Sequence, residues 1–337
     1  MNHRLHRRVF LATAAVTLAA PSLLRAAEPI KIRCSLDTAP SHPRNVAMLD
    51  YMAKLDKASN GAIKGEVFHS GQLFADLNVS KALVQGQVEM AVPGGWVMTG
   101  LVPDCDMAQL PYFYGLPIEQ THKATNGKAG AFVNKQLQDK LKTHVLGPWL
   151  DLGYQNWYST KVPLDKFEAM KGLKIRSPGG AGISWRIKFA GGIANTTAWP
   201  NVPLALSQGT FDAFISSDES CNSAKLWEAG VKYSYADHQF LAQYVPMLSK
   251  TAWEKLAPAQ QKMMADLWAE NIESYNKGSA ASQANARSIL EKNGVKFFDP
   301  GARTLATTRT AMIDDLATLV KDAKLSPEIV KLVKESV

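Results

Sequence analysis

Apolar residues in the first third of the chain recur at spacings that predict alternating strands and helices. Residues 30–36, 65–69 and 88–92 have the alternating or clustered apolar side chains of short strands. Between them, residues 48–61 and 79–86 place apolar side chains at helical spacing, and each segment ends at a glycine. We therefore expect right-handed strand-helix-strand units that form a largely parallel sheet flanked by helices.

The same order of elements returns after residue 150. Strands are predicted at 173–176, 193–197 and 211–215, with helices at 183–190 and 202–208 between them. This second set predicts a second sheet of the same kind, and hence two lobes.

A short internal echo relates the two predicted lobes. Residues 82–89 and 205–212 are identical at four of eight positions, and each segment has a glycine where a helix stops and a strand begins. The echo predicts that the loops after Val92 and Ile215 occupy matching places. Those places are the carboxyl ends of parallel strands, where open α/β sheets bind ligands.

The last quarter of the chain is predicted to be helical. From Pro258 apolar side chains recur at a 3.6-residue period as far as Tyr275, and helix-compatible residues continue to Lys292, with only Gly278 weakening them. This span is longer than an ordinary helix within one lobe. We expect this helix to pack across both lobes. A final helix is predicted at 305–323.

The composition adds an export signal to this picture. The chain has 337 residues, 46% hydrophobic and 20% charged, which suits a large two-lobed core and excludes a disordered chain or a coiled coil. Residues 1–27 contain four arginines and no acid, an apolar run, and the small residues Ala26 and Ala27, as in a cleaved secretory signal peptide. Arg7 and Arg8 resemble a twin-arginine motif, with an ordinary export signal as the alternative.

The rest of the chain lacks the signatures of several protein classes. Its 34 basic and 30 acidic residues leave a surplus of +4, too small for a nucleic-acid binder. The cysteines at 34, 105 and 221 are too widely spaced for a zinc site, and we favour buried, inert thiols over one disulfide. The sequence has no HExxH, GxSxG or phosphate-binding loop motif, so we expect no catalytic residues, metal or cofactor.

One cation lies where an α/β sheet binds ligands. Arg176 ends the strand at 173–176, and a proline, two glycines and the start of a helix follow it. An arginine fork beside free backbone N–H groups suits a carboxylate, although a surface arginine is the alternative. Trp96 and Trp199, in or beside the predicted inter-lobe loops, are either core residues or walls of a ligand site.

The order and spacing of several motifs resemble one family. The chain resembles the DctP-type solute-binding proteins of tripartite ATP-independent periplasmic (TRAP) transporters. The resemblance covers almost all of the chain after the signal, and the long helix from Pro258 also fits. Its motifs are Ser70–Leu73, Gln85–Ala91, Met170–Gly179 and Gln208–Asp212.

The resemblance implies a two-lobed α/β periplasmic-binding-protein fold, with mostly parallel sheets flanked by helices and a long C-terminal helix spanning both lobes. After a signal peptide at 1–27, lobe I would comprise residues 28–152 and about 242–281. Lobe II would comprise residues 153–241 and about 282–337. The implied function is to capture a small organic acid in the periplasm, by hinge closure, and to deliver it to the membrane subunits of a TRAP transporter.

The resemblance also implies the roles of particular residues. Arg176 matches the carboxylate anchor of the family, and Trp199 matches an aromatic residue that packs on the ligand. Ser216 stands where the family usually has asparagine. Asn156 stands where some relatives, including sialic-acid binders, have another arginine, which argues against a sialic-acid ligand.

The remaining expected pocket residues suggest a small ligand. Ser217 joins Asn156 and Ser216 as a neutral hydrogen-bonding group, Trp96 is a second wall, and the backbone of Gly95 is open to approach. His42 is a further candidate donor or a solvated turn residue. A malonate-sized diacid is the leading prediction, and a short keto, hydroxy or aromatic acid is the alternative.

Two other functions stay open at this point. An exported enzyme acting on small carboxylic acids would need a general base, for which Asp218 and Glu219 are the candidates, against a solvated turn or helix cap. A receptor that presents its closed form to a sensor kinase would need no catalytic group at all.

Overall fold

The computed structural model describes residues 28–337, so the predicted signal peptide lies outside the described residues. The first of two large sheets has the strand order β2-β1-β3-β12-β4. Strand β1 (Ile30–Ser35) is parallel to β2 (Ile63–Phe68) and β3 (Met90–Ala91). Strand β12 (Met247–Ser249) is antiparallel to β3 and to β4 (Thr143–Val145).

The second sheet has the order β13-β10-β6-β9-β7-β8. Five of its strands share one direction, and β6 runs against its neighbours β9 and β10. The prediction of mostly parallel sheets is therefore confirmed, with one reversed strand in each. The strands are β6 (Asn156–Ser159), β7 (Lys174–Ser177), β8 (Ile193–Thr196), β9 (Ala213–Ser216), β10 (Tyr233–Tyr235) and β13 (Lys296–Phe298).

Two antiparallel strands carry the chain between the sheets. Strand β5 (Leu150–Tyr154) leads from β4 into β6, and β11 (Leu241–Tyr244) leads from β10 into β12. The two strands pair with each other, with a register shift between Ala242 and Gln243. The reversed strand of each sheet is the one that enters directly from this crossing pair.

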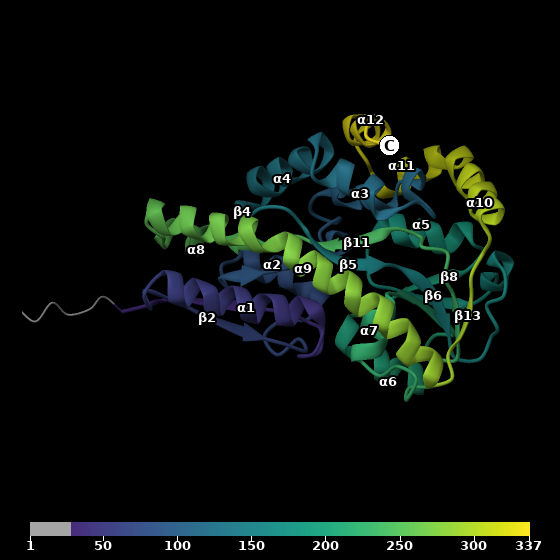
Figure 1. Cartoon of the computed structure of the whole chain (residues 1–337). Helices are drawn as coiled ribbons and strands as arrows, with labels where there is room; N and C mark the ends of the chain where they lie inside the picture. Colours follow the sequence, from purple (N-terminus) through teal and green to yellow (C-terminus); the bar gives the residue numbers. More distant parts are fainter. Residues whose placement is uncertain (1–27) are drawn as a thin grey trace, which may run out of the picture.

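The long helix predicted from Pro258 is confirmed as α9 (Pro258–Lys292), which has 35 residues. It follows α8 (Lys250–Lys255) beside the first sheet and ends just before β13 of the second. It packs on α1 (Pro43–Ala58), on β5 and on α7 (Asp218–Ser223). Figure 1 shows α9 crossing the molecule from α8 to α6 and α7.

The other helices flank the two sheets. Helix α1 buries Met48, Tyr51 and Leu55 against the first sheet, as its apolar spacing predicts. None of the described helices is long and apolar enough to cross a membrane. The remaining α-helices before α8 are α2 (Asp76–Val84), α3 (Ile118–Thr125), α4 (Lys128–Leu141), α5 (Ala181–Phe189) and α6 (Val202–Ser207).

The prediction of one final helix at 305–323 is wrong. The chain forms α10 (Ala302–Asp314) and α11 (Leu316–Ala323), separated at Asp315, and then α12 (Pro327–Lys334). The Asp315 carboxylate accepts hydrogen bonds from the Trp185 indole at 2.7 Å and from the Thr318 hydroxyl at 2.6 Å, which holds it in a turn. The cap of α12 at Ser326 was missed, although serine before proline is a helix-start signal.

One apolar cluster extends through both sheets and the crossing strands. It includes Ile32, Leu150, Ile215 and Trp268, none of them exposed. The cysteines at 34, 105 and 221 are buried and unbonded, as predicted. Burial raises the pKa of the Cys34 thiol to about 12, so this thiol is not reactive.

Candidate functional site

The carboxyl ends of strands from both sheets meet at one small cavity. Strand β1 supplies the residues after its end, and β7, β9, β5 and β11 supply side chains. The cavity is small: the volume open to the centre of a water molecule is about 30 Å³. The lining residues are Asp37, Thr38, Asp76, Trp96, Leu152, Gln155, Arg176, Pro178, Trp199, Ile215, Ser216, Ser220 and Tyr244.

Arg176 reaches the cavity from the end of β7 and is 1% exposed. Its Nε donates to the Thr197 carbonyl at 2.9 Å, and its Nη1 donates to the Ile215 carbonyl at 3.3 Å. Its Nη2 has no hydrogen-bond partner among residues 28–337. Burial lowers the pKa of Arg176 to about 10, which leaves it a cation at neutral pH with one donor group unused.

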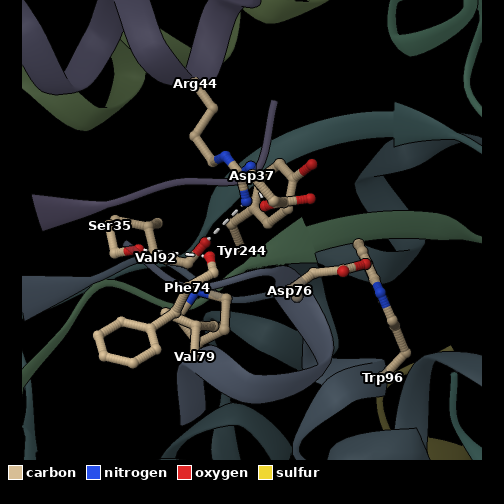
Figure 2. Close-up of a pocket in the computed structure, with 11 residues that line it drawn as sticks. Ser35, Asp37, Arg44, Phe74, Asp76, Val79, Val92, Trp96 and Tyr244 are labelled. Carbon is tan, nitrogen blue, oxygen red and sulfur yellow. Dashed lines mark hydrogen bonds and ion pairs between the residues drawn. The ribbon is translucent and has the colours of Figure 1, made fainter. Parts of the chain in front are cut away.

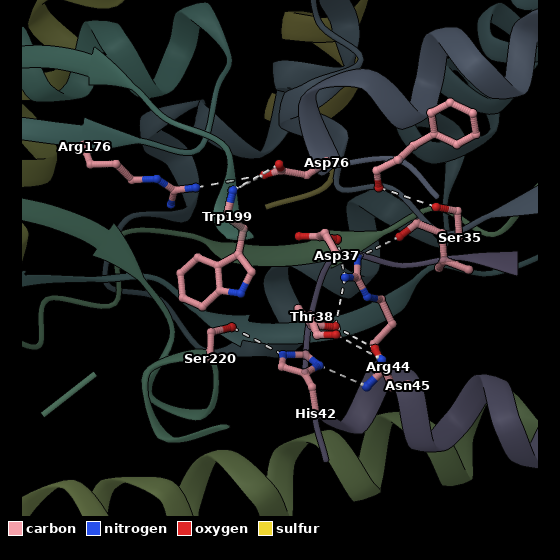
Figure 3. A network of polar contacts seen from close by, with 12 residues as sticks. Ser35, Asp37, Thr38, His42, Arg44, Asn45, Asp76, Arg176, Trp199 and Ser220 are labelled. Atoms are coloured by element: carbon pink, nitrogen blue, oxygen red, sulfur yellow. Dashed lines mark hydrogen bonds and ion pairs between the residues drawn. The ribbon is translucent and has the colours of Figure 1, made fainter. Parts of the chain in front are cut away.

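Asp76, at the start of α2, is the acid nearest to that donor. Its Oδ2 lies 4.0 Å from Nη2 of Arg176, which is an ion pair without a hydrogen bond (Figure 3). Both carboxylate oxygens accept from the Trp199 backbone N–H at 3.1 Å. Burial, with a contribution from the charge of Asp37, raises the pKa of Asp76 to about 6 despite the opposing effect of Arg176.

A second buried arginine lies beside the cavity. Arg44 descends from α1 and pairs with Asp37, as Figure 2 shows. It also donates to the Thr38 hydroxyl at 3.0 Å and to the Val92 carbonyl at 3.1 Å. Its guanidinium carbon lies 4.0 Å from the centre of the Tyr244 ring, a cation–π contact.

Four of the predicted site residues line the cavity: Arg176, Trp199, Ser216 and Trp96. Residues of the loops after Val92 and Ile215 line this cavity or the one beside it; that the two loops occupy matching places stays a prediction of the internal echo. Gly86 and Gly209 end their helices with φ of 69° and 68°, a left-handed conformation that glycine adopts without strain.

The other four predicted residues do not line the cavity. The Asn156 side chain donates to Asp218 at 3.0 Å and accepts from the His238 backbone N–H at 3.2 Å. Strand residues alternate in direction, so the preceding Gln155 faces the cavity instead. Ser217 caps α7 through its hydroxyl, and Gly95 begins a short 3₁₀ turn packed on the Cys105 carbonyl.

His42, the last of these four, caps α1 instead of facing the cavity. Its Nδ1 accepts from the Arg44 backbone N–H at 3.2 Å, so Nε2 carries the proton and donates to the Ser220 hydroxyl at 3.3 Å. Burial lowers the pKa of His42 well below its ordinary value, which keeps the ring neutral. His42 thus joins α1 of the first sheet to α7 beside the second.

The candidate general bases of an enzyme are used elsewhere. The Asp218 carboxylate accepts hydrogen bonds from the Tyr158 hydroxyl and from Asn156. Glu219 accepts from Asn222 at 3.2 Å within α7. Neither acid lines the cavity, and the described residues contain no cluster of three or more potential metal ligands.

Sequence reasoning missed Asp37, Arg44, Asp76, Gln155 and Tyr244. Asp37 directly follows β1, so the rule that located Arg176 could also have found it. Arg44 and Asp76 lie in the first turns of helices, and Tyr244 lies on a crossing strand. Their positions depend on how the two sheets face each other, which no local spacing reveals.

Comparisons with known proteins identify the family and the fold of this chain. The profile of bacterial extracellular solute-binding proteins, family 7 (DctP), matches residues 35–322. The chain is 26% identical over 308 residues to the C4-dicarboxylate-binding periplasmic protein DctP of Rhodobacter capsulatus, covering 91% of this chain and 89% of that protein.

Solved structures show the same fold. A TRAP periplasmic solute-binding protein from Sulfitobacter sp. NAS-14.1, with bound β-D-galacturonate, superposes with a TM-score of 0.82 at 22% identity. This match covers 90% of this chain and 98% of that one. One from Sulfurospirillum deleyianum, with bound succinate, has a TM-score of 0.83 at 20% identity and covers 91% and 99%. Both likenesses establish the two-lobed architecture.

Proposed function

The chain belongs to the DctP family of bacterial extracellular solute-binding proteins, and from this premise we propose that it captures a small organic acid anion in the periplasm. The closed, loaded form would then deliver the acid to the membrane subunits of a TRAP-type secondary transporter. The protein from Rhodobacter capsulatus is named for C4-dicarboxylate binding, and the two solved relatives hold a sugar acid and a diacid. We expect the ligand of this chain to carry a carboxylate as well.

The observation that carries the proposal is the unused donor of Arg176. A buried guanidinium is costly unless its N–H groups are hydrogen-bonded. Nη2 of Arg176 faces a cavity and has no partner in the described part of the chain. A ligand carboxylate at this place would supply the missing acceptor and a closer charge partner than Asp76, whose Oδ2 lies 4.0 Å from Nη2, and the buried setting strengthens the attraction.

Other groups of the cavity fit an oxygen-rich small molecule. Nε2 of Gln155 is a second donor without a partner among the described residues, and Gln155 is 4% exposed. Ser216 and Tyr244 add hydroxyl groups to the lining, while Trp96 and Trp199 provide its bulky walls. The small volume supports a ligand of a few carbon atoms, and the malonate-sized diacid stays a prediction of the sequence.

We propose hinge closure as the capture mechanism. Lobe I (28–152 and about 242–281) and lobe II (153–241 and about 282–337) would swing about β5, β11 and α9. Contacts that span the two sheets would hold the closed form. Examples are the hydrogen bond of His42 to Ser220 and that of the Trp199 backbone to Asp76. Closure would exclude water from the Arg176 site and so strengthen its ion pair.

A thermal-shift screen tests the proposed function. The mature protein is heated with each of about a hundred organic acids and with the neutral amides of the same acids. We expect at least one acid, and not its amide, to raise the melting temperature in proportion to the logarithm of its concentration, because it binds only the folded state. Stabilisation by an uncharged compound in place of any acid would contradict the proposal.

A further inference from the structure

The cavity beside Arg176 has two carboxylates on its wall as well as a cation, and each carboxylate is paired with an arginine. Asp37, just after β1, and Asp76, at the start of α2, both line it. Figure 3 shows these two carboxylates on the side of the cavity opposite β7 and Arg176. A carboxylate bound to Arg176 would therefore have two protein carboxylates as neighbours.

Arg44 does not supply an open cation for a second ligand carboxylate. Its Nη1 donates to the Val92 carbonyl, and its Nη2 donates to Asp37 and to the Thr38 hydroxyl. Its face is covered by the ring of Tyr244. Arg44 thus holds Asp37 in place and does not itself line the cavity, although its Nε has no hydrogen-bond partner among the described residues.

The opposite wall holds the unused donors. Nη2 of Arg176 and Nε2 of Gln155 have no hydrogen-bond partners within residues 28–337, and their side chains are 1% and 4% exposed. The cavity is therefore polarised, with open donors on the side of the second sheet and acceptors on the side of the first. A ligand that matches both walls needs an acceptor at one end and a donor at the other.

Two carboxylates at the acceptor wall, each already paired with an arginine, would leave a second ligand carboxylate without a cation of its own. The pKa of Asp76, near 6, leaves this group mainly ionised at neutral pH, and Asp37 is paired with Arg44. A second ligand carboxylate placed there would meet like charge in a site that water does not screen. A hydroxyl or ammonium group there would instead donate to a carboxylate, which is among the stronger hydrogen bonds in proteins.

Building on the proposed function, we propose that the ligand is a monocarboxylate with a hydroxyl or ammonium donor close to its carboxyl group. Its carboxylate would bind Arg176 and Gln155, and its donor would face Asp37 and Asp76. The site would select such acids against dicarboxylates. The malonate-sized diacid that the sequence favours would then be a poor ligand.

Titration calorimetry with matched acids tests this selection. The scaffolds are propionate, butyrate and phenylacetate, each unsubstituted, with a 2-hydroxyl group and with a 2-amino group; malonate and succinate are the diacids. We expect a hydroxy or amino acid to bind about 10–100-fold more tightly than the unsubstituted acid of its scaffold and than either diacid. The hydroxyl and amino series separate the two possible donors.

Substitutions at the acceptor wall test the residues involved. Asp37→Asn and Asp76→Asn keep the side-chain shape but remove the charge, so each should reduce the preference for the donor-bearing acid and improve binding of the diacids. Asp104→Asn is the matched control, because Asp104 is buried, does not line the cavity and accepts hydrogen bonds from Gln136 and Ser326, so it should keep the wild-type preference. Two variants are needed because either one could fail to fold.

The outcomes separate this inference from the proposed function. Tighter binding of an unsubstituted acid or a diacid overturns the selection and leaves organic-acid capture intact. An unchanged preference in both Asp37→Asn and Asp76→Asn also overturns it. If no acid binds in the thermal-shift screen, the proposed function fails and this inference fails with it.

Discussion

Asp106 shows how this molecule buries single carboxyl groups outside its cavity. Its Oδ2 accepts from the Gly182 backbone N–H at 2.9 Å, while Oδ1 has no partner among the described residues. Burial raises the pKa of Asp106 from 3.8 to about 7. The folded protein therefore holds the proton of Asp106 more tightly than the unfolded chain does. At a pH where Asp106 is ionised in the unfolded chain, burying this carboxyl group lowers the free energy of unfolding.

The pH dependence of stability follows from that sign. Asp106 should cost no stability below about pH 4, an increasing amount between pH 4 and 7, and a constant amount above pH 7. We expect the free energy of unfolding of Asp106→Asn, relative to that of the wild type, to be about 2–4 kcal/mol higher at pH 8 than at pH 4. Urea unfolding at both pH values measures this difference. The exposed Asp165→Asn is the control, and an unchanged gap for Asp106→Asn would contradict the prediction.

At the scale of secondary structure, two glycines allow a matched test. Gly209 ends α6 at a φ of 68°, and a Cβ there would contact nothing within 4 Å, so only backbone strain opposes alanine. Gly278 lies exposed inside α9, also with open space around it. We expect Gly209→Ala to destabilise the protein by about 1–2 kcal/mol and Gly278→Ala to stabilise it by about 0.5–1 kcal/mol.

Thermal or urea unfolding of both variants checks this prediction. Equal effects of the two substitutions would contradict the assignment of a left-handed turn at Gly209 and a helix at Gly278. The pair also keeps the chemical change constant, so only the backbone conformation differs.

The elements that sequence spacing predicted correctly are those with local signals. Helix α1 has apolar spacing and a glycine stop, and the first half of α9 has an apolar stripe that includes Met264, Trp268 and Ile272. Strands β5 and β11 were not predicted, because their pairing joins segments about 90 residues apart in the sequence. The break at Asp315 likewise depends on the indole of Trp185, which is distant in sequence.

The same division applies to the site. Arg176 drew notice as a strand end followed by glycines, and its role as carboxylate anchor came from the resemblance to the DctP family. Asn156 was expected in the cavity and Gln155 was not, since a position one residue off reverses the side-chain direction in a strand. Asp37 and Asp76 come together in the cavity only through the packing of the two sheets, so the charge balance of the cavity could not be predicted from the sequence.

At the scale of the whole molecule, polar contacts join the parts of the chain on either side of the cavity, and we propose that they belong to a closed form. Trp199 bonds to Asp76 through its backbone, and Gly182 bonds to Asp106. We expect the ligand-free protein in solution to sample a more open form. The acid that raises the melting temperature most should shift the protein to the closed form. Small-angle X-ray scattering should then show a smaller radius of gyration on addition of that acid. An identical scattering curve with and without the acid would contradict hinge closure.

The proposed function depends on Arg176 binding the carboxylate of the ligand, and calorimetry of Arg176 variants measures that interaction. With the best acid of the screen, Arg176→Ala should lose about 2–5 kcal/mol of binding free energy, because a buried charge pair loses one partner. Arg176→Lys should lose less, since it keeps the charge without the fork. The exposed Arg303→Ala is the control, and circular dichroism confirms folding. A folded Arg176→Ala variant that binds the acid as tightly as the wild type would contradict the account.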